Sequence, residues 1–185
     1  MKQLNQSIEV EVPIRTAYNQ WTQFESFPEF MSGVERVEQV SDTKTHWITK
    51  IMGVSREFDA EITEQHPDEW IAWKTEGGLE HSGEVIFKPS GDSATLVAVQ
   101  IEYEPQDYVE QAGVELGLVH QRLKSDLKHF KEFMESKGEE DDGWRGEIGE
   151  PLPDESAEPN EVAAPNESGA KSETDNDTAA ADEAG

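Results

Sequence analysis

Cysteine is absent from this chain of 185 residues, and its absence removes several kinds of chemistry. Without thiols there are no disulfide bonds, no thiolate ligands for a metal ion and no cysteine nucleophile. Long apolar runs are missing too. No stretch approaches the roughly 18 apolar residues of a membrane-spanning helix, and the N-terminus lacks the apolar core of a signal peptide. We therefore expect a cytoplasmic protein with no integral membrane segment.

Basic residues are scarce. The chain has 15 Lys and Arg against 41 Asp and Glu, which gives a formal net charge of −26. Phosphate groups are bound by clusters of Lys and Arg, so this composition argues against direct binding to nucleic acid or anionic lipid. The acidic excess favours solubility, and adaptation to a salt-rich cytoplasm would also produce it. The sequence leaves both explanations open and identifies no protein partner.

Motifs for metal, nucleotide and nucleophile chemistry are missing as well. The five histidines, at positions 46, 66, 81, 120 and 129, are spread along the chain, and no HExxH or paired-carboxylate motif accompanies them. No glycine-rich phosphate loop joins a strand to a helix, and the GxSxG of α/β-hydrolases is absent. We predict no metal site and no cofactor.

The composition changes abruptly at Gly138. Residues 1–138 carry 13 Lys and Arg against 25 Asp and Glu, a net charge of −12, and residues 139–185 carry 2 against 16, a net charge of −14. Large apolar residues are few after residue 138, so this segment cannot bury enough surface to offset its chain entropy. We predict one folded domain over residues 1–137 and a disordered acidic tail over residues 138–185.

Alternation of apolar and polar residues predicts a strand over Leu4–Val12. After Pro13 the spacing becomes helical, which predicts two short helices, Ile14–Trp21 and Ser26–Met31, the second capped by Ser26. Turn signals then delimit six further strands. Their predicted spans are Val34–Val40, Thr45–Met52, Ser55–Glu64, Trp70–Thr75, Ser82–Lys88 and Ala94–Glu104. Because the connections are short, neighbouring strands must be antiparallel.

One long amphipathic helix is predicted over Gln106–Lys137, with Asp107 as a candidate N-cap. Its apolar sector comprises Val109, Ala112, Leu116, Val119, Leu123, Leu127, Phe130 and Met134. The residues predicted to face away from that sector are Arg122, Lys124, Ser125, Lys128 and Glu132. A stripe of this length needs a broad sheet to pack against. The fold class is therefore α+β, with a seven-stranded curved antiparallel sheet wrapped around the C-terminal helix.

Two glycines near the start of the long helix bear on function. Gly113 and Gly117 remove side chains where a curved sheet and a helix would diverge, which predicts a ligand cavity at this end. Alternatively, the two glycines only permit close packing or a slight bend.

Several short sequence segments resemble those of the START-like helix-grip superfamily, in particular its polyketide cyclase/dehydrase and coenzyme Q-binding branch. The resemblance covers about residues 1–137, and the segment Gly143–Ile148 also looks like a short appendage of some bacterial relatives. These segments are Val12-Pro13 before Ala17-Tyr18-Asn19-Gln20-Trp21, Phe27-Pro28-Glu29-Phe30-Met31, Ile71-Ala72-Trp73-Lys74, Ser82-Gly83-Glu84-Val85-Ile86-Phe87 and Tyr103-Glu104-Pro105. The resemblance implies an apolar ligand cavity between sheet and helix, and it does not choose between binding and catalysis.

The candidate cavity residues come from four of the predicted strands and from the long helix. They are Trp47, Phe58, Ile62, Trp73, Val99, Ile101, Gly113, Leu116, Gly117 and His120. His120 is the one polar residue on the apolar sector and is the candidate catalytic residue, as a hydrogen-bond partner or proton shuttle; alternatively it is a rim histidine paired within the structure. The tryptophans either stack on a ligand ring or pack in the core. His81, at a strand end, is expected to be solvated.

From these features we predict a protein that binds a hydrophobic small molecule, such as a lipid, quinone or polyketide-like compound, and the sequence assigns it no particular enzyme activity. The first alternative is a polyketide cyclase or dehydratase that uses the same cavity. The second is a chaperone-like or partner-binding module. A cyclase would place two or more titratable residues inside the cavity, whereas a pure binder would have a nearly apolar lining.

Overall fold

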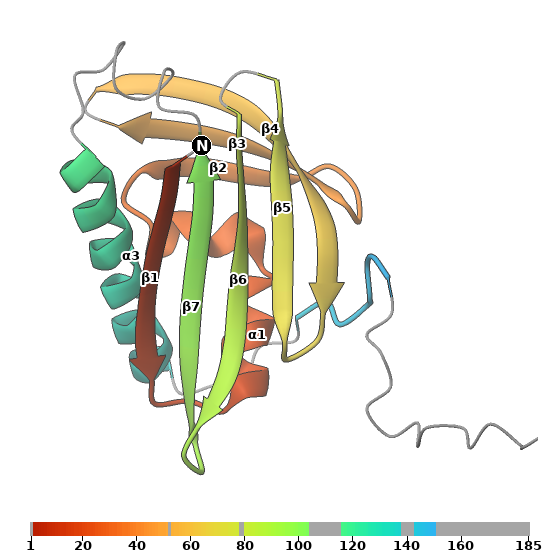
Figure 1. Cartoon of the computed structure of the whole chain (residues 1–185), viewed down its shortest axis with the longest axis vertical. Helices are drawn as coiled ribbons and strands as arrows, with labels where there is room; N and C mark the ends of the chain where they lie inside the picture. The colour runs from red at the N-terminus through yellow and green to blue at the C-terminus, as the bar shows by residue number, and fades with distance from the viewer. Residues whose placement is uncertain (1, 52, 78–79, 104–115, 138–142, 151–185) are drawn as a thin grey trace, which may run out of the picture. The chain divides into compact units, whose positions relative to one another are not determined.

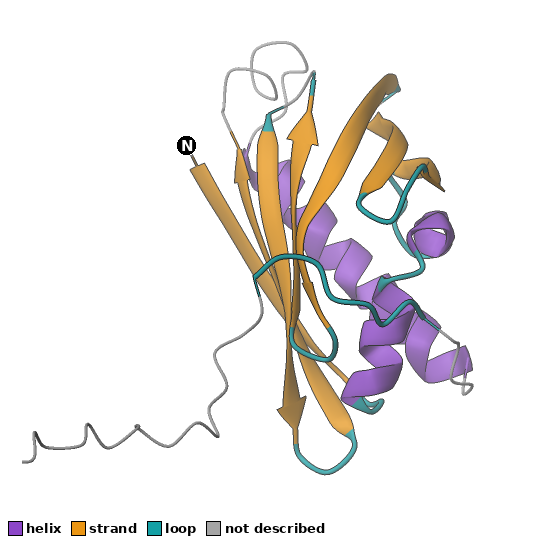
Figure 2. Ribbon diagram, turned by 90° about the vertical axis from the view of Figure 1, so that its right-hand side faces the viewer, coloured by secondary structure: helices purple, strands orange, loops and turns teal. Residues whose placement is uncertain are grey.

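Seven antiparallel strands form one curved sheet, and the helices lie against one of its faces (Figure 1, Figure 2). The computed structural model describes residues 2–51, 53–77, 80–103, 116–137 and 143–150. They lie within the unit Met1–Pro151. In chain order the elements are β1 (Lys2–Val10), α1 (Ile14–Trp21), the 3-10 helix η1 (Phe24–Glu29), β2 (Val34–Gln39), β3 (Lys44–Ile51), β4 (Val54–His66), β5 (Trp70–Glu76), β6 (His81–Ser90), β7 (Ala94–Tyr103) and α3 (Leu116–Lys137).

The strand order in the sheet is β1-β7-β6-β5-β4-β3-β2. From β2 to β7, each strand pairs with the next one along the chain, because their short connections allow only antiparallel neighbours. The first strand crosses over to pair with the last, in continuous register from Lys2 opposite Tyr103 to Val10 opposite Thr95. The predicted α+β class and seven-stranded antiparallel sheet are confirmed.

Two predicted boundaries differ from the structure near the N-terminus. Strand β1 ends at Val10 instead of Val12, because the Val12 N–H bonds to the Val10 carbonyl oxygen at 2.9 Å in the turn before Pro13. The second short helix begins before Ser26, whose Oγ donates to the Gln23 carbonyl at 2.7 Å and does not cap the helix.

The sheet is curved where its strands lose register. The pairing of β4 with β5 shifts between Ile62 and Glu64, and that of β2 with β3 shifts between Val34 and Arg36. An extra residue in one strand bends it and increases its local twist. These irregularities lie in the half of the sheet formed by β2 to β5, and η1 contacts β2 there.

Helix α3 packs its apolar stripe onto the sheet and ends at Lys137, as predicted. Leu127, Phe130 and Met134 are 1%, 0% and 3% exposed. The same half of the helix is tied to β1, where Lys131 Nζ donates to the Glu9 carbonyl oxygen at 2.8 Å. The predicted residues 106–115 of this helix, including Asp107 and Gly113, lie outside the described residues.

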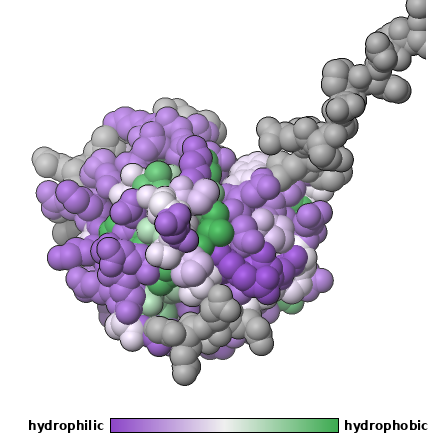
Figure 3. Space-filling model, turned by 90° about the horizontal axis from the view of Figure 1, so that it is seen from below, coloured by the Kyte–Doolittle hydropathy of each residue, from purple (hydrophilic) through white to green (hydrophobic). Residues whose placement is uncertain are grey.

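The outer surface carries few large apolar side chains. Among the described residues, only Val40, Val54 and Trp144 are both large and apolar and exposed, and hydrophilic residues cover most of the face shown in Figure 3. Within the described part of the chain, no helix is long and apolar enough to cross a membrane. The apolar residues of this domain are therefore directed inward.

Residues 143–150, here called the C-terminal strap, pack against the domain. Ile148 forms an antiparallel bridge with Gln65 near the end of β4: the Gln65 N–H donates to the Ile148 carbonyl at 2.8 Å, and the Ile148 N–H donates to the Gln65 carbonyl at 3.0 Å. Ile148 is half-buried against the core. The strap was predicted to belong to a disordered tail that starts at residue 138, and the structure corrects that boundary.

Arg145 holds the strap against α1 and the turn after β4. Its Nη1 donates to Asn19 Oδ1 at 2.7 Å, its Nη2 forms an ion pair with Asp68 Oδ2 at 2.6 Å, and its guanidinium lies 5.4 Å from the centre of the Tyr18 ring. Gly143 allows the close approach, since a Cβ there would come within 2.6 Å of the Asn19 backbone. Composition alone missed this docking because it depends on one cation and one backbone bridge.

We predict that Leu127→Ala lowers the free energy of unfolding by about 2–5 kcal/mol, because it removes a fully buried side chain from the packed stripe. Lys124→Ala, on the exposed side of the same helix, is the matched control and should change it by less than about 0.5 kcal/mol. Urea denaturation measures both. Equal effects would show that the helix packs through a different face.

A second prediction concerns the strap. Truncation after Asp142 removes the bridge to Gln65 and the Arg145 ion pair, and we expect it to lower the melting temperature by about 4–8 °C, for a loss of about 2 kcal/mol. Truncation after Pro151 is the control and should leave the melt within about 2 °C of the full chain. Identical melts for the two truncated proteins would contradict a stabilising role for the strap.

Candidate ligand-binding site

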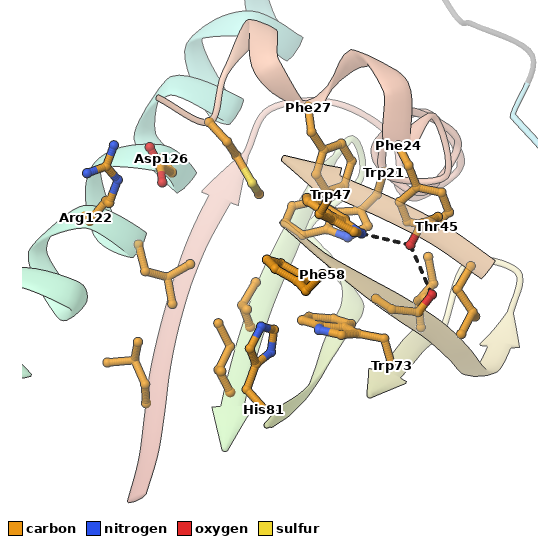
Figure 4. A pocket seen from close by; sticks show the side chains of 18 of the residues that line it. Trp21, Phe24, Phe27, Thr45, Trp47, Phe58, Trp73, His81, Arg122 and Asp126 are labelled. Atoms are coloured by element: carbon orange, nitrogen blue, oxygen red, sulfur yellow. Dashed lines mark hydrogen bonds between the residues drawn. The ribbon is translucent and has the colours of Figure 1, made fainter. Parts of the chain in front are cut away.

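A cavity of about 220 Å³ lies between the sheet and helix α3. Fifteen of its 19 lining residues are apolar, and four, Thr45, His81, Arg122 and Asp126, are polar. The apolar ones are Leu4, Trp21, Phe24, Phe27, Met31, Trp47, Phe58, Ala60, Ile62, Ile71, Trp73, Val99, Ile101, Val119 and Leu123. Figure 4 shows aromatic rings on one side of the cavity and the helix residues Arg122 and Asp126 on the other.

The aromatic wall is built by side chains from η1, β3, β4 and β5. Trp47 and Phe58 are cross-strand partners with parallel rings 6.1 Å apart, and Phe27 meets Trp47 edge-on at 5.5 Å. Trp73 lies over Gly83, its cross-strand partner in β6. A Cβ at Gly83 would come within 2.5 Å of the Trp73 ring, so the glycine makes room for the indole. These contacts hold flat apolar surfaces toward the cavity.

The polar groups within this wall are already paired. Trp47 Nε1 donates to Thr45 Oγ1 at 2.8 Å, and Thr45 Oγ1 donates to the Ala60 carbonyl oxygen at 3.3 Å (Figure 4). Thr45 is 2% exposed. Because these donors and acceptors satisfy one another, this part of the lining presents apolar surface despite its hydroxyl and indole nitrogen.

His81 is a polar group that remains unpaired. It lies at the start of β6, its ring meets Phe58 edge-on at 5.4 Å, and its Nδ1 is buried without a hydrogen-bond partner among the described residues. Its backbone is fixed by Thr75, whose Oγ1 accepts from the His81 N–H at 2.9 Å. Burial lowers the pKa of His81 to about 4, so the ring is neutral at neutral pH.

Arg122 and Asp126, one helical turn apart on α3, line the opposite side. Asp126 is 8% exposed, and its Oδ1 accepts from both the backbone N–H and the Oγ of Ser32 at 3.2 Å. Burial raises the pKa of Asp126 above its usual range, while the Ser32 hydrogen bonds and Arg122 oppose that rise. Arg122 Nη2 donates to Ser32 Oγ at 3.3 Å. Together they join the helix to the loop that follows η1.

The structure brings together six of the ten residues predicted for the cavity. They are Trp47, Phe58, Ile62, Trp73, Val99 and Ile101. Gly113 lies outside the described residues, and Leu116 and Gly117 are described only by their backbone, which begins α3.

His120 does not lie where the sequence analysis placed it. Its ring is exposed and its Nε2 contacts Gln6 Nε2 of β1, outside the cavity lining. The cavity-facing residues of α3 centre on a direction near that of Val119, and residue 120 is about 110° away from it around the helix axis. The expectation that Arg122 faces away is corrected for the same reason: the cavity lies to one side of the apolar sector of α3, the side on which Arg122 falls.

Sequence reasoning also missed the contributions of the short helices and of His81. Phe24 and Phe27 enter the cavity from η1, and their spacing of three residues was the available signal. His81 looked like a solvated strand end, because the ring that covers it, Phe58, comes from a strand two positions away in the sheet. Among the described residues, no group of three or more His, Asp or Glu side chains is placed to hold a metal ion.

Residues 10–132 match the model of a family described as polyketide cyclase/dehydrase and lipid transport. An uncharacterized 17.2 kDa protein of Streptomyces lincolnensis, from the melC2-rnhH intergenic region, is 54% identical over 149 residues, which are 80% of this chain and 99% of that protein.

Solved structures share the fold. A Deinococcus radiodurans protein is 26% identical with a TM-score of 0.59, covering 74% of this chain and 99% of that one. A START superfamily protein from Mycobacterium smegmatis is 15% identical with a TM-score of 0.56, covering 73% of this chain and 95% of that one. At the latter identity the likeness concerns the fold alone, which is START-like.

The burial of His81 predicts a pH dependence of stability. Its pKa is about 4 in the folded protein against an ordinary value of 6.5, so the unfolded chain binds a proton that the folded chain excludes between these values. The free energy of unfolding should therefore fall as the pH decreases through that window. Between about pH 7 and pH 5 the contribution of His81 is on the order of 2 kcal/mol.

Urea denaturation at the two pH values tests this. His81→Leu should lose less stability on acidification than the wild type, whereas His129→Leu, on the exposed side of α3, should follow the wild type. If acidification lowered the free energy of unfolding equally in all three proteins, the burial of a neutral His81 would be contradicted.

Proposed function

We propose, because this chain belongs to the polyketide cyclase/dehydrase and lipid transport family, that its cavity between sheet and C-terminal helix holds a hydrophobic small molecule such as a lipid, quinone or polyketide-like compound. The START-like fold is one that binds hydrophobic ligands. The observation that carries the proposal for this chain is the lining, in which 15 of 19 residues are apolar. Transfer of apolar ligand surface from water into such a lining contributes roughly 25 cal/mol per Å².

The size of the cavity limits what it encloses. Its volume of about 220 Å³ is below the roughly 300–1,000 Å³ typical of sites for drug-sized ligands. It therefore suits one or two fused rings, or one segment of a longer acyl or polyketide chain. The flat surfaces of Trp47, Phe58 and Trp73 favour a planar group, since offset or edge-on ring contacts add to the energy of burial.

A polyketide cyclase or dehydratase is the second candidate, favoured by one observation. Besides Arg122, the lining holds two titratable side chains, His81 and Asp126. A general base works best with a pKa near the working pH, and burial lowers the pKa of His81 to about 4, which makes it a weak base. Asp126 is also engaged by Ser32 through two hydrogen bonds. These features favour binding over proton transfer.

Filling the cavity tests the proposed binding. Ala60 lines the cavity from β4 and is 4% exposed, so Ala60→Leu should occupy space that the ligand needs and weaken binding about 10-fold or more. Binding of 2-naphthol is measured by equilibrium dialysis, alongside a thermal melt. The matched control is Ala98→Leu, which makes the same change in β7 on the face away from the cavity.

Loss of binding with a retained fold in Ala60→Leu, and wild-type binding in Ala98→Leu, is the expected result. Wild-type affinity in a folded Ala60→Leu protein would show that the probe binds elsewhere and would contradict the proposed site.

A further inference from the structure

Two cavities meet at His81. The first is the aromatic cavity described above, and the second, of about 180 Å³, is lined by Leu4, His81, Ile101, Tyr103 and Val119. All of these except Tyr103 also line the first cavity, so the two spaces adjoin across a shared wall. In Figure 4 the His81 ring points from its strand into the space beside Phe58 and Trp73. The imidazole is thus the polar group at the junction of two apolar compartments.

The position of the ring is fixed by contacts that do not use its nitrogens. The backbone N–H and carbonyl of His81 both bond to Thr75 Oγ1, at 2.9 and 3.0 Å, and Phe58 meets the ring edge-on. These contacts orient the imidazole and leave Nδ1 buried without a partner among the described residues. A buried polar atom without a partner destabilises the protein unless another molecule satisfies it.

Because the His81 ring is neutral, its one donor and one acceptor determine which ligand group can form a hydrogen bond with it. An imidazole without a charge has one N–H donor and one acceptor nitrogen, and the tautomer decides which of them is Nδ1. A hydroxyl group suits either tautomer, because it can both donate and accept, whereas a carbonyl oxygen suits only the one with a proton on Nδ1. Ionic groups gain little at this ring, since it carries no charge and most of its neighbours, such as Leu4, Phe58 and Ile101, are apolar. The charged residues Arg122 and Asp126 line the opposite side of the first cavity.

We propose that His81 is the specificity-determining residue of the cavity, and that it selects apolar ligands with a neutral oxygen, a phenolic or other hydroxyl above all, placed between two apolar portions. This inference rests on the proposed function, because it assigns the polar contact of the same cavity. The apolar portions lie in the two compartments, and the oxygen meets the imidazole at their junction.

The test compares two ligands that differ by one hydroxyl group, 2-naphthol and naphthalene. Equilibrium dialysis gives the ratio of their dissociation constants, naphthalene over 2-naphthol, for each protein. His81→Phe keeps an aromatic ring but removes both nitrogens, so this ratio should fall about three- to tenfold, the usual range for one net hydrogen bond. His129→Phe, on the exposed side of α3, is the matched control and should keep the wild-type ratio.

A second variant and a second measurement separate recognition from structure. His81→Gln restores a hydrogen-bonding side chain and should recover part of the ratio, which a merely structural role of the ring would not explain. In the wild-type protein, the ¹⁵N resonances of the His81 ring should shift on saturation with 2-naphthol and not with naphthalene. This measurement needs no variant, so it tests the contact between the ligand hydroxyl and the His81 ring even if His81→Phe does not fold.

The outcomes distinguish the inference from the proposed function. The role of His81 would be overturned if wild type and His81→Phe had the same ratio of dissociation constants, or if the ring ¹⁵N resonances did not shift with 2-naphthol. The cavity would then remain the binding site. If neither probe bound the wild-type protein, the proposed function itself would be contradicted.

Discussion

The packing of Phe130 is the contact on which the rest of the domain depends. This ring is 0% exposed and meets Trp21 of α1 and Phe30, next to η1, edge-on at 5.1 Å each. It therefore joins the C-terminal helix to both short helices, which themselves contact the sheet through Phe87 and Trp47. With this end of the helix packed, the curvature of the sheet leaves open space at the other end, and the cavity occupies it.

Most polar groups that line the cavity are paired within the protein and a few are not, as expected of a cavity that selects its ligand. Donors and acceptors in the aromatic wall pair with one another, as Trp47 and Thr45 do, and the carboxylate of Asp126 pairs with Ser32. His81 differs, because its backbone is paired and its Nδ1 is not; among the described lining residues, Arg122 Nε on the opposite side is likewise buried without a partner. A protein that only needed a packed core would gain stability from an apolar residue at this position, since an unpaired buried nitrogen is costly.

The C-terminal strap shows how a polar segment joins a folded domain with few apolar residues. Ile148 supplies one half-buried side chain and a two-bond backbone bridge, and Arg145 supplies the other contacts, with Asn19, Asp68 and the Tyr18 ring. Arg145 is one of two cations after residue 138. Charge-assisted hydrogen bonds to partly buried partners are stronger than neutral ones, so one arginine can offset the low hydrophobicity of its neighbours.

The amino-acid sequence by itself determined the order and type of the elements. The seven strands, the short helices and the end of the long helix at Lys137 follow from local periods of two and about 3.6 residues, together with proline and glycine signals. Antiparallel pairing follows from short connections. Six cavity residues were predictable too, because aromatic and β-branched residues on the inward face of a strand alternate in a way that is visible along the chain.

Only the tertiary structure decided which polar side chains line the cavity. The cavity lies to one side of the apolar sector of α3, which places Arg122 in its lining and His120 at the surface against Gln6, 114 residues before it in the chain. The burial of His81 depends on Phe58 from another strand, and the docking of Arg145 depends on Asn19, 126 residues before it. Local periodicity cannot determine such contacts, because their free energy arises from groups that are neighbours only after the sheet has closed around the helix.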